Sequence, residues 1–331
     1  MRAAWAIVVV SVLGLAFAVV GPDLFPAPGG SSLALAAGDH VVAFEHQGRR
    51  RSYLVHVPPA VSSGAALPVV LDFHGAWRSG WGQRAWSRFD RLSDAEGFLA
   101  VEPQGTGPLP GVGRTWNASG CCGYARAHEV DDVGFVVTLL EDLARRVPVD
   151  HTRVYATGLS NGGMMAHRLA ADAPERFAAV ASVAGPFMET GFASDRPTPV
   201  MHIHSRSDER VPFGGGAGSS FPPLGNDPYP PVAATIGTWV EHDGCPRTPS
   251  EDPAREDASH HRAVRSTYGP CRDGTEVVLW TLTGPGHVWP GAPSTWRSLL
   301  LGPATSVIDA SEEMWRFFRR FSRPDAPPLA G

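Results

Sequence analysis

Gly158-Leu159-Ser160-Asn161-Gly162 is the most informative stretch of this 331-residue chain. It follows a short apolar segment, Arg153–Thr157, whose residues favour a β-strand, and it leads into Asn161–Ala171, whose residues favour a helix. A serine flanked by glycines at a strand–turn–helix junction predicts a nucleophile on a very tight turn, because larger side chains beside it would clash. Such a turn would project the Ser160 hydroxyl clear of the sheet, next to a helix N-terminus that favours negative charge.

Strands and helices alternate on either side of this turn. Apolar runs such as Pro68–Phe73 and Pro199–His204 predict strands buried on both faces, and two alternating segments, His40–Phe44 and Ser52–Val57, predict a hairpin. This alternation predicts an α/β fold with a mostly parallel central sheet flanked by helices. Since no repeat or dividing linker interrupts it, residues 37–331 are expected to form a single catalytic domain. The other expected strands are Phe98–Val101, Phe177–Val183 and Glu276–Leu282, and the other expected helices are Arg84–Glu96, Val232–His242 and two that begin at Asp131-Asp132 and at Asp309.

A serine hydroxyl needs a base that accepts its proton, and two downstream loops supply the candidates. In folds with this junction, an acid and a histidine follow the serine along the chain in that order. His287 follows an expected strand in the glycine-rich loop Gly284–Gly291, so the backbone can bring its imidazole close to Ser160. Asp208 and Glu209 both follow the preceding strand, and Asp208 is the better candidate because it comes first and is shorter. The predicted triad is Ser160, Asp208 and His287, in which the acid holds the tautomer of the histidine.

The tetrahedral intermediate of acyl transfer carries a negative oxygen that needs preorganised donors. One donor is expected from the backbone N–H of Asn161, the residue after the nucleophile. The second is expected from the loop after Pro68–Phe73, and we assign it to Ala76, with Trp77 as the neighbouring alternative. His74, in the same loop, is expected to form structural hydrogen bonds.

The chain has 10 tryptophans, and three of them lie on loops beside these candidate residues. Trp77, Trp116 and Trp289 are expected to surround the mouth of the site, where their indole rings would contact sugar rings or aromatic acyl groups. The alternative is that they only support the loops. The long segment Phe213–Pro231, rich in glycine and proline, is expected to flank the same site.

The N-terminal residues have the pattern of an export signal. After Met1-Arg2, an apolar run from Ala3 to Val20 precedes a stretch rich in Pro, Gly and Ser, and Ala34-Leu35-Ala36 offers a small-x-small cleavage site. Residues 1–36 are therefore expected to be a signal peptide or, if uncleaved, a membrane anchor. Either outcome predicts a secreted or extracytoplasmic protein.

Four cysteines agree with an oxidising compartment. Their spacing is poor for zinc, and a disulfide between Cys245 and Cys271 is expected. The adjacent Cys121 and Cys122 would then form a vicinal pair or remain free thiols.

Composition excludes several other functions. The net charge of −5 gives no sign of a basic surface for nucleic acid, and the chain contains no lysine, which removes P-loop phosphate binding and Schiff-base chemistry. His202 and His204 share one face of a strand without a third ligand, so they are interpreted as packing residues, and no metal or cofactor is expected. His260-His261 are expected in an exposed charged loop, and Asp131-Asp132 at the start of a helix.

Together these motifs resemble those of the secreted polyhydroxybutyrate-depolymerase-like esterases, a group of α/β-hydrolases that overlaps with feruloyl and acetylxylan esterases. The resemblance implies the same triad, an acyl-enzyme mechanism and no cofactor. The sequence departs from the pattern of that group at Ala76-Trp77-Arg78, where glycines are frequent, so a narrower acyl pocket is expected. The motifs that carry the resemblance are His74-Gly75, Glu102-Pro-Gln-Gly105, Cys122-Gly-Tyr124, Val130-Asp-Asp-Val-Gly-Phe135, Gly158-Leu-Ser-Asn-Gly-Gly-Met-Met165, Asp208 with Val211-Pro212, and Gly286-His-Val-Trp-Pro-Gly291.

The sequence thus predicts an exported serine esterase that hydrolyses acetyl, hydroxycinnamoyl or short hydroxyalkanoate esters of small molecules or oligosaccharides. Two alternatives remain at this point, a serine peptidase on the same fold and a non-catalytic exported binding protein. No nucleic-acid partner is expected, and contact with a membrane is expected only through an uncleaved N-terminal helix.

Overall fold

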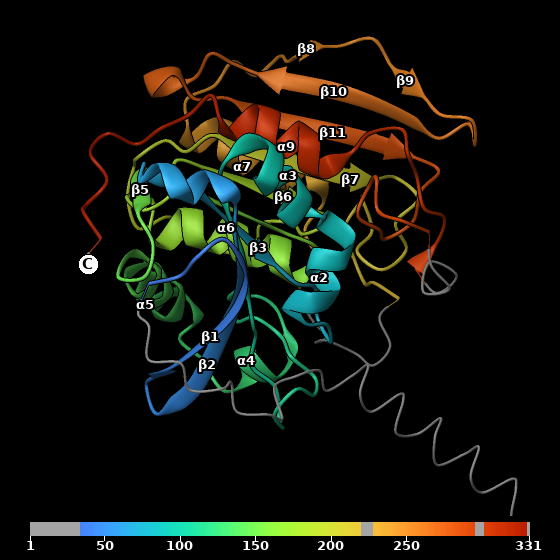
Figure 1. Cartoon of the computed structure of the whole chain (residues 1–331). Coiled ribbons are helices and arrows are strands. Elements are labelled where there is room, and N and C mark those ends of the chain that lie inside the picture. Colours follow the sequence, from blue (N-terminus) through green and yellow to red (C-terminus); the bar gives the residue numbers. More distant parts are fainter. Residues whose placement is uncertain (1–33, 220–227, 295–300, 330–331) are drawn as a thin grey trace, which may run out of the picture.

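The residues with described positions form an eleven-stranded β-sheet through the centre of the protein, and Figure 1 shows its place between the helices. The computed structural model describes residues 34–219, 228–294 and 301–329. The strands are β1 Gly38–His46, β2 Arg49–Val57, β3 Leu67–Phe73, β4 Leu99–Pro103, β5 Val149–Gly158, β6 Ala179–Val183, β7 Val200–Ser205, β8 Ser250–Glu251, β9 Arg255–Glu256, β10 Arg262–Tyr268 and β11 Val277–Thr283. Across the sheet they follow the order β1-β2-β4-β3-β5-β6-β7-β11-β10-β8, and β9 also pairs with β10.

The middle of the sheet is parallel and its margins are antiparallel. β3 pairs in parallel with β4 and β5, and the parallel part continues through β6, β7 and β11. The β1–β2 hairpin adds to β4 at one margin, and β10 adds to β11 at the other. Every residue of β3, β4, β6 and β7 is buried, as expected for strands covered on both faces. The predicted α/β fold with a mostly parallel sheet is confirmed.

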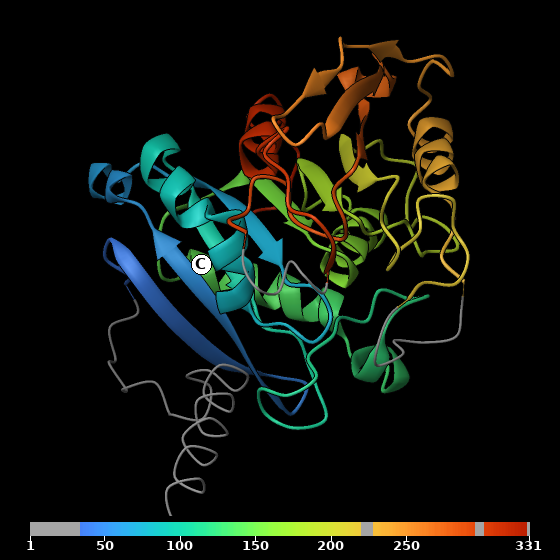
Figure 2. The same cartoon turned by 90° about the vertical axis from the view of Figure 1, so that its right-hand side faces the viewer.

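Helices cover both faces of this sheet (Figure 2). They are α2 Gly80–Ser87, α3 Phe89–Glu96, α4 Gly123–Ala127, α5 Asp132–Ala144, α6 Asn161–Asp172, α7 Val232–His242 and α9 Ala310–Phe318, with short 3-10 turns at Pro59–Ser63 and Arg272–Gly274. Neighbouring residues of β3 point to opposite faces, so Val69 and Leu71 pack in one core with α5, α6 and α7. Val70 packs in the other core with α3 and α9. The carboxyl ends of β5, β7 and β11 meet at one edge of the sheet, where the site lies.

The chain departs from the sequence-based expectation in two places. The expected helix Arg84–Glu96 is split into α2 and α3, because Arg88 adopts a left-handed conformation with φ 55° and its N–H donates to the carbonyl oxygen of Arg84. His261 is buried beside β10 rather than placed in an exposed loop. We did not predict β10 because only two of its residues, Ala263 and Ser266, are buried, which leaves little apolar periodicity.

Two disulfides are present in the described chain. Cys245, just after α7, is joined to Cys271 in the connection between β10 and β11, as the sequence analysis expected. Cys121 is joined to its neighbour Cys122, and this pair packs against Met164 of α6.

Part of the predicted organisation concerns residues outside the described ranges. Of the expected export signal, residues 1–33 lie outside the described ranges, as do residues 220–227 of the expected flanking segment. Within residues 34–219, 228–294 and 301–329, no helix is both long enough and apolar enough to cross a membrane.

Candidate active site

Ser160 lies on a tight turn between β5 and α6 that leaves no room for side chains at positions 158 and 162. The residue has φ 57° and ψ −123°, a strained conformation, and its N–H donates to the carbonyl oxygen of Val183 at 2.7 Å. A Cβ atom on Gly158 or on Gly162 would clash with the carbonyl oxygen of Phe73. The glycines of the turn are therefore required by the backbone of β3, against which the turn packs.

Asp208 lies in the turn after β7 and is surrounded by four N–H groups. Its Oδ1 accepts the backbone N–H groups of Arg210 at 2.8 Å and of Val211 at 2.9 Å. Its Oδ2 lies 2.7 Å from Nδ1 of His287 and 3.5 Å from Nε2 of His204. These contacts on both oxygens hold the carboxylate in one orientation.

The Asp208 carboxylate stays charged although it is buried. Burial alone would raise its pKa, but the positive charge that His287 can carry and the hydrogen bonds from His204 and His287 hold the pKa of Asp208 well below its usual range. A permanently ionised acid can stabilise an imidazolium ion. Glu209, the alternative acid, is exposed, and it is Asp208 that accepts the His287 N–H.

His287 lies in the loop after β11 and directs Nδ1 at Asp208. Its backbone N–H donates to the carbonyl oxygen of Leu301 at 2.6 Å, and a side chain on the neighbouring Gly286 would clash with that same segment. Since Nδ1 donates to Asp208, a neutral His287 ring carries its lone pair on Nε2. Ser160 and His287 follow strands that end at the same edge of the sheet, although no hydrogen bond joins them within the described residues. Such bonds commonly tighten only when substrate is bound.

Two backbone N–H groups beside Ser160, those of Ala76 and Asn161, donate to no acceptor within the described residues. A Cβ atom on Gly75 would lie 3.6 Å from the Cβ of Ser160, which places the loop after β3 directly against that serine. The N–H of Trp77, the alternative donor, is occupied, because it donates to the carbonyl oxygen of Arg114 at 2.7 Å. Ala76 and Asn161 are thus the pair available to bind an oxyanion.

His74 holds this loop in place, as the sequence suggested. Its Nδ1 donates to the carbonyl oxygen of Gly75 at 2.8 Å, and its Nε2 accepts the N–H of Gly105 at 3.0 Å. Burial lowers the pKa of His74 to about 4, so the ring is neutral and adds no charge beside Ser160.

Trp116 and Trp289 do not surround the mouth of the site, and this part of the prediction was wrong. Trp116 is fully buried, and its indole N–H donates to the carbonyl oxygen of His74 at 2.9 Å. Its backbone N–H and carbonyl oxygen bond the Asn161 side chain at 2.7 and 3.0 Å. Trp289 is 1% exposed and donates to the Ser311 hydroxyl at 3.1 Å. Each indole N–H finds an acceptor inside the protein, so both rings support loops from within.

Trp77 is the one of these three tryptophans that faces solvent, with 50% of the residue exposed. Its ring lies over the segment around Gly113, where an added Cβ atom would come within 3.2 Å of it. Two further apolar residues on neighbouring segments, Trp81 and Leu109, are 36% and 64% exposed. We did not single out these two residues because neither belongs to a motif.

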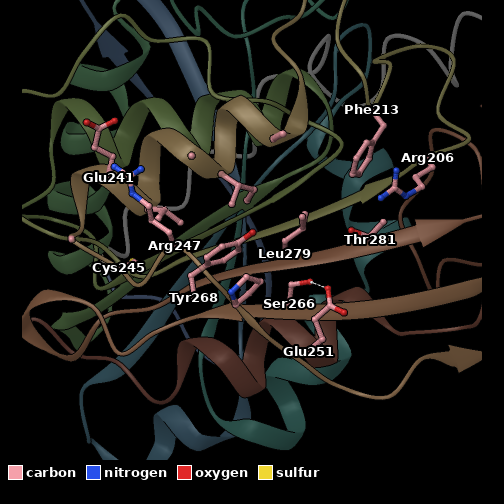
Figure 3. A pocket seen from close by; sticks show the side chains of 16 residues that line it. Arg206, Phe213, Glu241, Cys245, Arg247, Glu251, Ser266, Tyr268, Leu279 and Thr281 are labelled. Carbon is pink, nitrogen blue, oxygen red and sulfur yellow. Dashed lines mark hydrogen bonds between the residues drawn. The ribbon is translucent and has the colours of Figure 1, made fainter.

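A groove of about 850 Å³ lies between α7 and the strands β10 and β11 (Figure 3). Arg206 and Phe213 line one end, next in sequence to the turn of Asp208, with the Arg206 guanidinium 4.7 Å from the ring centre of Phe213. Tyr268 and Arg247 line the groove farther from that turn. The groove gave no signal in the sequence because its walls come from distant segments.

His202 and His204 are buried, in agreement with the predicted packing role, but they also form hydrogen bonds. His202 Nε2 lies 3.0 Å from His204 Nδ1, and His204 approaches Asp208. We missed this contact, whose signal was the four-residue spacing between His204 and Asp208 across the end of the strand. Among the residues with described positions, no three His, Cys, Asp or Glu side chains are arranged to hold a metal ion.

The chain is similar to several proteins with esterase names. It is 35% identical over 277 residues to a protein named "Putative esterase NocK" from Nocardia uniformis subsp. tsuyamanensis, a match that covers 80% of this chain and 78% of that protein. It is 26% identical to a bifunctional acetylxylan esterase/xylanase of Neocallimastix patriciarum, covering 73% of this chain and 31% of the relative. It is 24% identical to feruloyl esterase B of Piromyces equi, covering 72% of this chain and 42% of that relative. The chain thus spans less than half the length of these last two relatives.

Family and structure comparisons agree on the fold. The model of the prolyl oligopeptidase family matches residues 88–198, which include Ser160 but neither Asp208 nor His287. The solved acetyl xylan esterase from Aspergillus awamori has a TM-score of 0.54 at 16% identity, covering 85% of this chain and 99% of that one. A solved thermostable esterase has a TM-score of 0.51 at 16% identity, covering 86% of this chain and 63% of that one. At this identity the two structures show a shared fold alone.

Proposed function

The chain belongs to a feruloyl esterase-like family of α/β-hydrolases and is a carboxylic-ester hydrolase, and from this premise we propose that Ser160, Asp208 and His287 are its catalytic triad. The observation that carries the proposal is the 2.7 Å contact between His287 Nδ1 and Asp208 Oδ2, at the sheet edge where Ser160 lies on its strained turn. The low pKa of Asp208 supports it further, because a charged acid fixes the tautomer of the histidine and stabilises its cation.

In the proposed mechanism, His287 Nε2 takes the proton of Ser160 while Oγ attacks the carbonyl carbon of the ester. The carbonyl oxygen becomes an oxyanion, which accepts hydrogen bonds from the backbone N–H groups of Ala76 and Asn161. The bond to the alcohol oxygen then breaks, and the alcohol leaves with the proton that His287 carried. A water molecule, deprotonated by the same histidine, attacks the acyl-enzyme. The bond from the acyl carbon to Oγ then breaks, Ser160 takes back the proton from His287, and the carboxylic acid leaves.

For the substrate, we propose an acetyl or hydroxycinnamoyl ester of a small alcohol or an oligosaccharide. Two relatives named as acetylxylan and feruloyl esterases support this choice. Trp77 supports it as well, because its half-exposed ring lies on the loop that packs against the nucleophile, and an indole face suits both aromatic acyl groups and sugar rings. Short hydroxyalkanoates are a third acyl class, which we expect to be cleaved faster as soluble esters than as a polymer film.

We further propose that the enzyme works outside the cytoplasm. The apolar, export-like run within residues 1–36 and the two disulfides support this location. Mass spectrometry of protein recovered from the culture medium should find Ala37 at the N-terminus. Recovery of the whole N-terminal run in the membrane fraction would identify an anchor instead.

The match to the prolyl oligopeptidase family over residues 88–198 supports a second candidate, a serine peptidase. The same triad and oxyanion donors would attack a peptide carbonyl group, but His287 would then have to protonate a departing amine. The esterase names among the relatives favour the ester.

A substrate panel with one variant separates these candidates. Wild type and Ser160→Ala should be compared on p-nitrophenyl acetate, methyl ferulate, acetylated xylan, polyhydroxybutyrate film and a proline-containing peptide amide, with fluorophosphonate labelling in parallel. We expect Ser160→Ala to lose labelling and at least about a thousandfold in ester hydrolysis, with little change in thermal midpoint. Activity within tenfold of wild type would contradict the triad, and fastest turnover of the film or the peptide would contradict the proposed substrate.

A further inference from the structure

A line of hydrogen-bonded rings leads from the interior of the protein to Asp208. Trp239 Nε1 lies 3.1 Å from His167 Nδ1, and His167 Nε2 lies 3.4 Å from His202 Nδ1. His202 Nε2 lies 3.0 Å from His204 Nδ1, and His204 Nε2 lies 3.5 Å from Oδ2 of Asp208. The four rings come from α7, α6 and β7, and no more than 1% of any of them is exposed.

The chemistry of the indole fixes the direction of every hydrogen bond in this line. An indole N–H can only donate, so Nδ1 of His167 must accept, and the ring proton of His167 sits on Nε2. A neutral imidazole has one donor and one acceptor, so the same assignment passes to His202 and then to His204. His204 therefore presents an N–H at Nε2, which donates to the carbonyl oxygen of Val211 at 2.8 Å and points to the Asp208 carboxylate.

This one-way order requires neutral rings. Burial lowers the pKa of His167 to about 3, and burial, followed by the charges that His204 and His167 could carry, lowers the pKa of His202 well below its usual range. Apolar rings flank the line, with Phe187 6.0 Å from His167 and Phe213 5.8 Å from His204 between ring centres. Between these apolar rings, each imidazole finds its polar partners along the line itself, or at its end in Val211 and Asp208.

We propose that the line makes His204 a positioning residue for Asp208: the Trp239 N–H fixes the tautomers of His167 and His202, so that His204 always offers the carboxylate a proton. The inference rests on the proposed function, because it takes Asp208 as the catalytic acid. In the opposite tautomer, the lone pair on Nε2 would face two acceptors, the Asp208 carboxylate and the Val211 carbonyl group, and would repel both. Asp208 would then be free to turn away from its partner in the triad.

Nuclear magnetic resonance of the full-length protein with ¹⁵N-labelled histidine measures these tautomers directly. We expect the proton on Nε2 for His167, His202 and His204, with the rings of His167 and His202 neutral from roughly pH 6 to pH 8. Trp239→Phe should disturb this assignment, starting at His167, because a phenyl ring cannot donate. An Nδ1–H tautomer at His204, or a spectrum that Trp239→Phe leaves unchanged, would overturn the proposal.

Kinetics of two His204 variants separate positioning from packing. His204→Gln keeps a donor near the position of Nε2, whereas His204→Leu keeps an apolar side chain and loses the donor. On p-nitrophenyl acetate we expect His204→Leu to lower kcat about tenfold with KM changed less than about twofold, and His204→Gln to keep kcat within about threefold. Equal losses in both variants, or unchanged kcat in His204→Leu, would show that the ring only packs.

Trp280→Phe is the matched control for Trp239→Phe. Trp280 is as deeply buried, but its indole N–H has no acceptor among the described residues. We expect Trp239→Phe to lower kcat about threefold and Trp280→Phe to leave it unchanged, since only the first removes a hydrogen bond. Equal kcat values in the two variants would contradict the proposal.

These measurements remain decisive if His204→Leu does not fold, because the spectra and the tryptophan pair do not depend on that variant. They also distinguish the inference from the proposed function. If the wild type is not labelled by fluorophosphonate, the triad itself is refuted, whereas the tautomers are measured without turnover. Locked tautomers together with unchanged kcat in every variant would refute the positioning role alone.

Discussion

The two sides of Ser160 are built in different ways. On one side, the loop after β3 offers the backbone N–H of Ala76 and is held by the buried indole of Trp116. On the other side, the turns after β7 and β11 offer the side chains of Asp208 and His287. We call the first the oxyanion side, which consists of residues 74–78 with Trp116 and Asn161, and the second the acid–base side, which consists of Asp208 and His287 with His204.

This difference determines what a substitution can do on each side. Every residue except proline has a backbone N–H, so the oxyanion side tolerates a new side chain as long as the loop keeps its position. On the acid–base side, the proposed mechanism uses the side chains themselves as the reacting and charged groups, so no other part of the residue replaces them. Effects on activity should therefore be abrupt on the acid–base side and graded on the oxyanion side.

Asp208→Asn should have the largest effect of the changes that keep Ser160. An amide carries no charge to stabilise the imidazolium, and its NH₂ group facing His287 favours the wrong tautomer. We expect kcat on p-nitrophenyl acetate to fall on the order of 10³- to 10⁴-fold. Glu209→Gln, at the next and exposed position, is the control and should keep kcat within about twofold. A larger loss in Glu209→Gln than in Asp208→Asn would transfer the role of the acid to Glu209.

Two buried neutral histidines, His74 on the oxyanion side and His167 in the line of rings that leads to Asp208, should make the protein sensitive to acid. Burial lowers the pKa of His74 to about 4 and that of His167 to about 3, from 6.5. In the unfolded chain both rings take up protons below pH 6.5, but in the folded chain they do not. Their contribution to stability is thus complete above that pH and is lost as the pH falls toward the folded values. Urea titrations should show the free energy of unfolding falling by about 2 to 3 kcal/mol per histidine from about pH 7.5 to about pH 4.5.

A pair of histidine variants checks the source of that sensitivity. His167→Phe removes one of the buried titrating groups, so its stability should depend less steeply on pH than that of the wild type. His260→Gln removes a histidine whose side chain is 88% exposed, and it should leave the pH dependence unchanged. A wild-type stability that does not vary across this range would show that the buried rings already carry protons in the folded protein.

Sequence reasoning succeeded where chemistry leaves a local pattern. The strand–turn–helix junction at Ser160 could be predicted because a tight turn needs glycines and a buried parallel strand needs an apolar run. The capping residue Asp309 of α9 left an equally local signal, and its side chain accepts the N–H of Glu312 in the structure. In each case the residues that carry the signal lie within a few residues of the feature that they predict.

Prediction failed where contacts between distant segments decide the outcome. Trp116 was expected at the mouth of the site, but the acceptor of its indole N–H is the carbonyl oxygen of His74, 42 residues away in the sequence. The spacing of His202 and His204 indicated a shared strand face, yet nothing local indicated that α6 and α7 place further ring donors in line with them. Burial of a loop tryptophan and the order of a hydrogen-bonded line both depend on how the chain packs.

Trp116→Phe tests whether the oxyanion side depends on its support. The change keeps an aromatic ring against Phe73 but removes the N–H that holds the His74 carbonyl group. We expect kcat to fall about tenfold and the free energy of unfolding to fall by about 1 to 2 kcal/mol. Trp315→Phe, which removes an indole N–H bonded to Glu96 in the core on the other face of the sheet, should lower stability without changing kcat. Unchanged kcat in both variants would show that the loop keeps its position without Trp116.

Trp77→Ala should have the smallest effect, and it should act on binding. The backbone N–H that anchors residue 77 to Arg114 remains in alanine, although φ of 64° is mildly unfavourable for either residue. Loss of the exposed indole should raise KM for methyl ferulate about three- to tenfold with kcat within about twofold, and KM for ethyl acetate, which has no ring, should not change. Trp81→Ala removes a partly exposed indole placed against Arg84. It is the control and should leave KM unchanged for both methyl ferulate and ethyl acetate. If Trp77→Ala instead lowers kcat for both esters and leaves KM unchanged, the indole holds the oxyanion loop, and side chains would then matter to the chemistry on both sides of Ser160.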